Sequence, residues 1–86
     1  MDDARNEARK FAVQVADRIL AGTVTPYDGA HEIWRCLSEH GQVGIEDLGL
    51  FIGLASEWQD SPEFRPSLEA DIIDEARLVV ERFSHL

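Results

Sequence analysis

The chain has 86 residues, of which 44% are hydrophobic, and a formal net charge of −9 at pH 7. This length suits a single domain, residues 1–86, with a modest core. The acidity disfavours nucleic acids and anionic membranes as partners, because each phosphate contact would be made in a repulsive field. Because the chain shows neither a signal-peptide pattern nor an apolar run near the roughly 20 residues that cross a bilayer, we expect a cytoplasmic protein.

Two helices are predicted in the first half of the chain. The first is indicated by apolar residues at three- and four-residue spacings: Ala4, Ala8, Phe11, Ala12, Val15, Ala16 and Ile19. Gly22 then supplies a left-handed stop. Thr25 and Pro26 are typical of an N-cap and a first helical residue, since proline lacks the N–H group that would be unsatisfied there. The second helix has an apolar face made of Tyr27, Ala30, Ile33, Trp34 and Leu37, and Gly41 and Gly44 follow it.

The third predicted helix, about 45–58, is apolar on more than one side. Its main apolar face comprises Ile45, Leu48, Phe51, Ile52, Ala55 and Trp58, and Leu50 and Leu54 extend it around the back. We therefore expect this helix at the centre of the fold. Gly49 and Gly53 each cost about 1 kcal/mol relative to alanine inside a helix, so we interpret them as a strip against which another backbone packs closely. On this interpretation Gly53→Leu is severely destabilising.

The remainder of the chain predicts a connector and a last helix. The connector, 59–67, contains Pro62 and Pro66, and proline pushes the residue before it away from helical dihedral angles. Ser67 is the predicted N-cap of the last helix, whose apolar stripe comprises Leu68, Ile72, Ala76, Val79, Val80 and Phe83. Short connections favour antiparallel neighbours. The sequence therefore predicts an all-α fold, a single antiparallel four-helix bundle.

No catalytic or metal-binding motif orders the titratable residues. His31 is followed four residues later by Arg35, where a zinc-protease helix needs a second histidine. Asp28 with His31, and Cys36 with His40, supply only two ligands each. Cys36 is the only cysteine, which excludes an intramolecular disulfide, and we interpret it as a small apolar residue on a helix flank. We therefore expect no enzyme activity, no catalytic residue, no metal and no cofactor.

Acidic residues crowd the second half of the chain. Residues 46–75 carry nine carboxylates and one base, Arg65. Such a density either keeps a protein soluble or is offset by a positively charged partner. On the last helix Asp71 and Asp74 point away from the apolar stripe, with Leu78 among them and Glu75 at the edge. The candidate partner-binding residues are Glu57, Asp60, Glu63, Asp71, Asp74 and Leu78.

Two aromatic residues near the connector allow two interpretations. Trp58 and Phe64 could supply the aromatic bulk that dominates the energetics of interfaces. The alternative is structural: Trp58 continues the core stripe of the third helix, and Phe64 closes one end of the bundle.

Three segments carry a resemblance to a known family: a polar hinge at 19–25, an acidic connector at 55–63 and a terminal segment at 79–83. In these segments the chain resembles the small helical immunity proteins of the colicin D type. The resemblance implies an acidic protein that covers the basic substrate channel of a ribonuclease toxin, with carboxylates imitating phosphates. It implies toxin contacts at Glu57, Asp60, Glu63, Asp71 and Asp74. The pattern of Gly29, Phe51-Ile52-Gly53 and Ser56-Glu57 equally resembles small bacterial helical proteins with no assigned activity.

The sequence thus favours a non-enzymatic, acidic protein-binding domain. Its most specific hypothesis is an immunity protein that neutralises a basic nuclease toxin, with charge complementarity as the physical basis. The alternative is a structural or regulatory helical module that self-associates as a homodimer through Leu50 and Leu54. A metal- or ligand-dependent enzyme is the least favoured class.

Overall fold

The structure, a computed structural model, describes residues 3–39 and 48–84. These residues form helices α1 (Asp3–Ala21), α2 (Pro26–Glu39), α3 (Gly49–Asp60) and α4 (Arg65–Phe83), with the 3₁₀ turn η2 (Pro62–Phe64) before α4. The described part of the chain contains no strand, which confirms the predicted all-α class. None of the described helices is both long and apolar enough to span a membrane.

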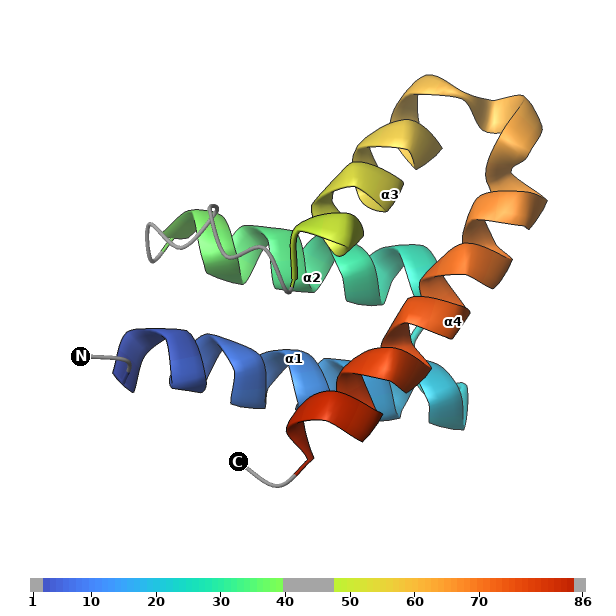
Figure 1. The fold of residues 1–86 in the computed structure, drawn as a ribbon. Helices are drawn as coiled ribbons and strands as arrows, with labels where there is room; N and C mark the ends of the chain where they lie inside the picture. The colour runs from blue at the N-terminus through green and yellow to red at the C-terminus, as the bar shows by residue number, and fades with distance from the viewer. Residues whose placement is uncertain (1–2, 40–47, 85–86) are drawn as a thin grey trace.

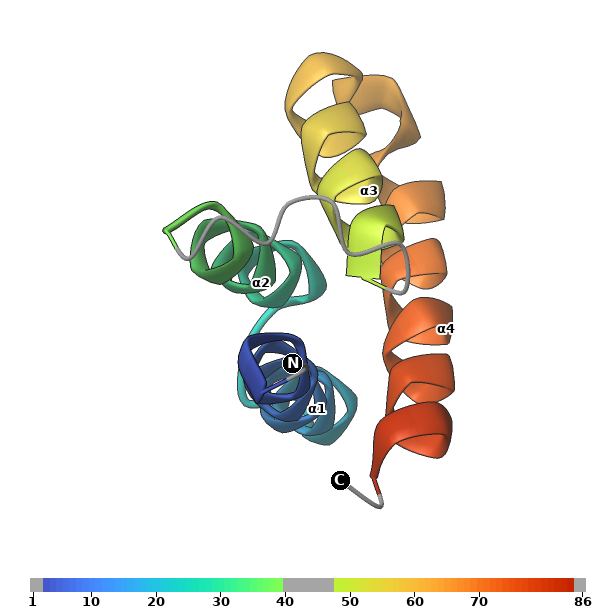
Figure 2. The ribbon, with the colours of Figure 1, turned by 60° about the vertical axis from the view of Figure 1, so that its left-hand side comes forward.

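The four helices form two antiparallel hairpins that cross each other (Figure 1). The first hairpin is α1 and α2, and the second is α3 and α4. Figure 2 shows the first hairpin on one side of the molecule and the second on the other. Helix α1 packs against α4 and α2, and α3 packs against α2 and α4. The packing confirms the predicted four-helix bundle.

The prediction that the third helix lies at the centre is wrong. Helix α3 packs on α2 and α4 but makes at most marginal contact with α1. Its buried residues are Phe51 and Ala55, whereas Leu50 on its outer side is 53% exposed. The apolar residues on its second side misled the prediction, because no other helix covers Leu50. Ile45, the predicted start of this helix, lies outside the described residues, as do Gly41 and Gly44.

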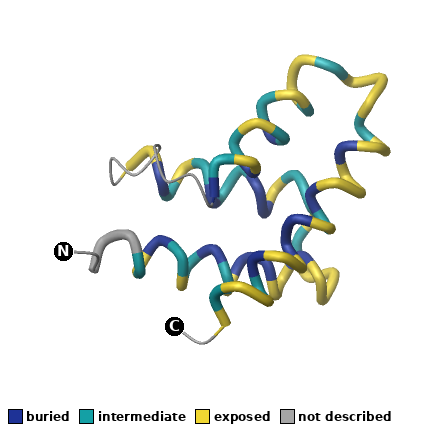
Figure 3. The backbone as a smooth tube through the Cα atoms, in the orientation of Figure 1, coloured by how far each residue is buried: buried dark blue, intermediate teal, exposed yellow. Residues whose placement is uncertain are grey.

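The core contains one apolar stripe from each helix, visible as the inward-facing buried positions in Figure 3. Helix α1 contributes three alanines and two larger residues to this core, α2 contributes three residues, α3 two with Leu48 just before it, and α4 four. The buried apolar residues are Ala8, Ala12, Val15, Ala16, Ile19, Ala30, Ile33, Leu37, Leu48, Phe51, Ala55, Leu68, Ile72, Ala76 and Val79. Every one belongs to a stripe that the periodicity predicted, so the buried faces of the helices were read correctly.

The predicted boundary between the first two helices is confirmed in atomic detail. Gly22 has φ +79°, the left-handed conformation that ends α1. The Thr23 amide donates to the Arg18 carbonyl at 3.0 Å, and the Gly22 amide donates to the Ile19 carbonyl at 3.2 Å. On the other side of the turn, Thr25 caps α2, because its Oγ1 accepts a hydrogen bond from the Asp28 amide at 3.1 Å.

The predicted start of the last helix is wrong by three residues, since the N-cap is Phe64 rather than Ser67. Helix α4 begins at Arg65 rather than after a Ser67 cap, and Pro66 lies in its first turn. A proline is tolerated there because the first N–H groups of a helix have no partner within it. The residue at the cap position is Phe64, which makes no side-chain capping bond. Between α3 and α4 the chain forms the tight turn η2, closed by the Phe64 amide donating to the Ser61 carbonyl at 3.0 Å.

The close helix packing that we assigned to Gly49 and Gly53 occurs elsewhere. A Cβ atom at either glycine would meet nothing within 4 Å, so the interpretation of these residues as a packing strip is wrong, and so is the expected severe effect of Gly53→Leu. The glycine that needs its small size is Gly29 of α2. A Cβ atom there would lie 2.5 Å from Ile19 Cγ1 and 3.3 Å from Val15 Cγ1. Helices α1 and α2 therefore approach each other at Gly29.

We expect alanine to have opposite effects at two glycines. Gly29→Ala should lower the free energy of unfolding by about 1–3 kcal/mol, because the buried Ile19 side chain must shift to admit the methyl group. Gly53→Ala, the matched control, should raise it by about 1 kcal/mol through helix propensity alone. Urea denaturation followed by far-ultraviolet circular dichroism measures both. Equal effects at the two positions would contradict the assignment of close packing to Gly29.

Candidate functional site

The six predicted partner-binding residues all lie on the second hairpin, and all are exposed. They form two groups. The first group is at the corner between α3 and α4 and comprises Glu57, Asp60 and Glu63. The second runs along α4 and comprises Asp71, Asp74 and Leu78, whose side chain is 43% exposed. Spacings of three and four residues place the second group in one row on the helix.

Charge is divided unequally between the two hairpins. Residues 3–39 carry six carboxylates and five bases, whereas residues 48–84 carry eight carboxylates and three bases. The first hairpin is therefore close to neutral and the second strongly negative. Three further carboxylates, those of Asp2, Glu46 and Asp47, lie outside the described residues. A cationic molecule approaching the described surface would be drawn mainly to the second hairpin.

Few neighbouring cations offset the carboxylates of the second hairpin. Asp74 pairs with Arg77 at 3.2 Å, an exposed pair of the kind that contributes little to stability. Glu57 accepts a hydrogen bond from the Ser61 hydroxyl at 3.1 Å. Within residues 3–39 and 48–84, Asp60, Glu63 and Asp71 have no ion-pair partner. Their charges are thus directed to solvent.

Glu75 differs from the other carboxylates of α4. We expected it at the edge of the apolar stripe, but its side chain is buried, with 7% of its surface exposed. Burial raises the pKa of the Glu75 carboxyl, and the nearby positive charge of Arg82 opposes part of that rise. The ionised carboxylate therefore costs the folded state free energy at neutral pH.

The structure also brings together an aromatic strip that the sequence reasoning missed. We use this name for Tyr27, His31, Trp34 and Trp58, which are all half-buried. The Tyr27 and Trp58 rings are stacked, with centroids 5.3 Å apart and planes 18° apart. The His31 ring lies 5.7 Å from Tyr27 and 5.8 Å from Trp34, the latter edge-on. An unbroken series of ring contacts therefore crosses from α2 to α3.

Polar contacts hold the Tyr27 and Trp58 side of the strip, next to the first residue of α4, Arg65. The Gln59 Nε2 donates a hydrogen bond to the Tyr27 hydroxyl at 2.7 Å. The Arg65 guanidinium lies 5.4 Å from the centroid of the Trp58 ring, and Arg65 Nε donates to the Trp58 carbonyl at 3.1 Å. Trp58 is therefore a half-exposed link between helices rather than a continuation of the core. Phe64 is 56% exposed, so the expectation that it closes the end of the bundle is wrong.

Part of this strip leaves a signal in the sequence. Tyr27, His31 and Trp34 are spaced i, i+4 and i+7, which places them on one side of α2 beside the core stripe. We assigned Tyr27 and Trp34 to the apolar face and considered His31 only as a possible metal ligand. The contact between Tyr27 and Trp58 joins distant parts of the chain, so no local pattern predicts it.

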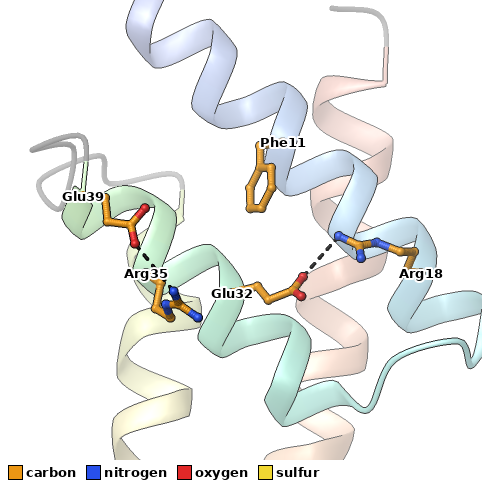
Figure 4. A pocket seen from close by; sticks show the side chains of 5 residues that line it. All are labelled: Phe11, Arg18, Glu32, Arg35 and Glu39. Atoms are coloured by element: carbon orange, nitrogen blue, oxygen red, sulfur yellow. Dashed lines mark hydrogen bonds and ion pairs between the residues drawn. The ribbon is translucent and has the colours of Figure 1, made fainter.

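A shallow hollow of about 220 Å³ lies between α1 and α2 (Figure 4). Its lining residues are Phe11, Arg18, Glu32, Arg35 and Glu39. Arg18 pairs with Glu32 at 3.1 Å, and Arg35 pairs with Glu39 at 3.7 Å. Because each guanidinium faces a carboxylate, the hollow offers no concentration of one charge. The Arg18–Glu32 pair joins the two helices, and we assign the hollow a structural role.

Two observations on the described residues bear on thiol chemistry and metal binding. Burial raises the pKa of the half-buried Cys36 thiol, and the negative charge of Glu39 raises it further, so both effects disfavour the reactive thiolate. His40, the second ligand that we considered beside Cys36, lies outside the described residues. Within the described ranges no three His, Cys, Asp or Glu side chains are grouped so that they could hold a metal ion.

We expect Glu75→Gln to stabilise the protein at neutral pH. A carboxyl whose pKa is higher in the folded than in the unfolded state contributes stability at low pH and loses it as the pH rises through the folded pKa. The melting temperature of the variant should exceed that of the parent at pH 7. This gain should disappear below the ordinary glutamate pKa of about 4.3.

The matched control is Glu69→Gln, which removes the same charge from an exposed position of α4. Any relief of general repulsion appears in both variants, so the difference between them isolates the burial of Glu75. Equal melting temperatures for the two variants at pH 7 would show that the buried carboxylate costs nothing.

No protein-family model, curated protein or solved structure matches the chain.

Proposed function

We propose that the chain is a protein-binding domain whose second hairpin binds a basic partner. The observation that carries this proposal is the unequal division of charge between an almost neutral first hairpin and a strongly acidic second one. A need for solubility alone would be met by charges distributed over both hairpins. Concentrating them on one half instead produces a field with a direction, which orients and accelerates the approach of a cationic protein.

The exposed residues would contribute to binding in two ways, through unpaired carboxylates and through apolar surface. Asp60, Glu63 and Asp71 are not paired with any described cation, so they can accept hydrogen bonds from lysine or arginine without first breaking an ion pair. Leu78, on the same side of α4 as Asp71 and Asp74, supplies apolar surface within an acidic border. This combination resembles the apolar centre and polar rim of many protein interfaces.

The most specific form of the proposal is an immunity protein that neutralises a nuclease toxin. A nuclease binds phosphates through a basic channel, and carboxylates at the surface of a rigid helical hairpin could occupy the same channel. The resemblance of the hinge, connector and terminal segments to immunity proteins of the colicin D type supports this form. In this role the chain inhibits by covering the channel and performs no chemistry.

The proposal is tested with a charge variant that breaks no described ion pair. The variant combines Asp60→Asn, Glu63→Gln and Asp71→Asn. The variant and the parent are each used to capture proteins from lysates of the cells that produce them, and the captured proteins are compared. We expect a basic partner that the parent captures and the variant does not. The association rate of the purified partner should fall roughly tenfold between low and physiological salt. If the partner is a nuclease, an equimolar amount of the chain should block its cleavage of RNA.

A matched control separates the position of the charges from their number. Glu7→Gln, Asp17→Asn and Glu39→Gln neutralise as many exposed carboxylates on the first hairpin. Two of these substitutions also break the exposed pairs Lys10–Glu7 and Arg35–Glu39, which are of a kind that contributes little to stability. This variant should retain the partner. Equal losses in the two variants, or an association rate that does not respond to salt, would refute binding through the second hairpin.

A second candidate function, self-association, is favoured by the outer side of α3. Leu50 is 53% exposed, and the positions of Gly49 and Gly53 face open space. No charged residue occurs in the first eight positions of this helix, 49–56. Two copies could therefore approach each other here with less repulsion than over the rest of the second hairpin.

Light scattering distinguishes the two candidate functions. A homodimer that uses this face should become a monomer in Leu50→Glu, because the substitution places two like charges in the interface. Leu20→Glu, at an exposed leucine of α1, is the matched control and should not change the mass. A parent protein that remains monomeric at high concentration would exclude self-association as the function.

A further inference from the structure

We propose that the aromatic strip of Tyr27, His31, Trp34 and Trp58 is the anchoring surface for an arginine-bearing segment of the basic partner. The inference rests on the proposed function for the charge of the partner, and it adds a second contact surface and a preferred side chain. The acidic hairpin attracts the partner from a distance. The strip holds it at close range.

The strip has the composition and the rigidity of an anchoring surface. Tryptophan and tyrosine are the residues most enriched among those that dominate binding energy. Each ring of the strip contacts another, and the Tyr27 hydroxyl is held by Gln59 at 2.7 Å. Side chains that are already fixed lose little conformational freedom when a partner binds. The rings are half-buried, unlike the fully buried core residue Phe51, so part of their surface is open to a partner.

The strip also shows which kind of side chain it accepts. The Arg65 guanidinium lies over the Trp58 ring at 5.4 Å from its centroid, so a ring of the strip already carries a cation from its own chain. Among the residues that adjoin the strip in sequence are the exposed carboxylates Asp28 and Glu57. An arginine can stack on an aromatic face and donate hydrogen bonds to a neighbouring carboxylate at the same time, which a lysine does less well.

A second copy of the chain fits this surface poorly. It would bring a like net charge of −9 toward a strip whose neighbours in the sequence include the carboxylates Asp28 and Glu57. The described cations nearest in sequence are already engaged, Arg35 by Glu39 at 3.7 Å and Arg65 by Trp58. The charge around the strip therefore favours a cationic occupant.

The test uses two short peptides as probes: one in which arginine alternates with glycine and serine, and the same peptide with lysine in place of arginine. The chain has two tryptophans, Trp34 and Trp58, and both belong to the strip. Its indole N–H groups therefore give two NMR signals that report on this surface alone. We expect the arginine peptide to shift both signals saturably and to bind more tightly than the lysine peptide.

Trp34→Leu tests the strip itself, because it keeps an apolar side chain and removes the ring. It should weaken binding of the arginine peptide roughly tenfold. Phe64→Leu is the matched control, since Phe64 is an exposed aromatic residue outside the strip, and it should leave the affinity unchanged. Circular dichroism verifies that both variants are folded. If Trp34→Leu does not fold, His31→Ala replaces it with the same expected direction.

The outcomes separate this inference from the proposed function. If Asp60→Asn, Glu63→Gln and Asp71→Asn together abolish peptide binding while Trp34→Leu binds like the parent, the acidic hairpin binds cations and the strip inference is wrong. Equal affinities for the arginine and lysine peptides, or indole signals that do not move, would also overturn it. If neither peptide binds, the strip inference falls, whereas the proposed function is still decided by the capture experiment.

Discussion

Burial of one apolar stripe from each helix is the constraint on which the rest of the structure depends. A single stripe can be covered only if each helix turns it toward the others, and crossing two antiparallel hairpins satisfies this condition for all four helices. Gly29 lets the first hairpin close tightly, with α2 approaching Ile19 and Val15 of α1. Once the stripes face inward, the carboxylates opposite them must face solvent. The acidity of the second hairpin is therefore presented at the surface by the same packing that forms the core.

Local features of the sequence predicted the fold well where local physics decides the outcome. Among the residues whose burial the structure describes, the periodicity identified every buried apolar one. Gly22 and Thr25 marked helix ends because their conformation and hydrogen bonds involve only neighbouring residues. Apart from the start of α4, which is a local error, the errors concern relations between helices. Gly49 and Gly53 have the spacing of a packing strip, but whether a second backbone passes beside them depends on where α3 lies, and it lies at the edge. The burial of Glu75 was missed for the same reason, because it depends on how the other helices pack around α4.

For the candidate sites, too, features set by spacing within one helix were predictable, and contacts between residues far apart in the chain were not. The exposure of Asp71, Asp74 and Leu78 was predictable, because their spacing places them opposite the apolar stripe of α4. The aromatic strip was not, because the stacking of Tyr27 on Trp58 requires the second hairpin to cross the first at one particular place. Half-buried aromatic rings also resemble core residues in a sequence, since both recur at helical spacing. Only their exposure in the folded chain distinguishes a surface from a core.

The position of the two tryptophans has a practical consequence for following how this protein unfolds. Trp34 and Trp58 lie on either side of the junction between the hairpins, and neither belongs to α1 or α4. Intrinsic fluorescence therefore senses separation of α2 from α3 and is blind to events at the contact between α1 and α4, whereas helicity senses the whole chain. Coincident transitions by the two probes would mean that the hairpins come apart and melt as one cooperative unit.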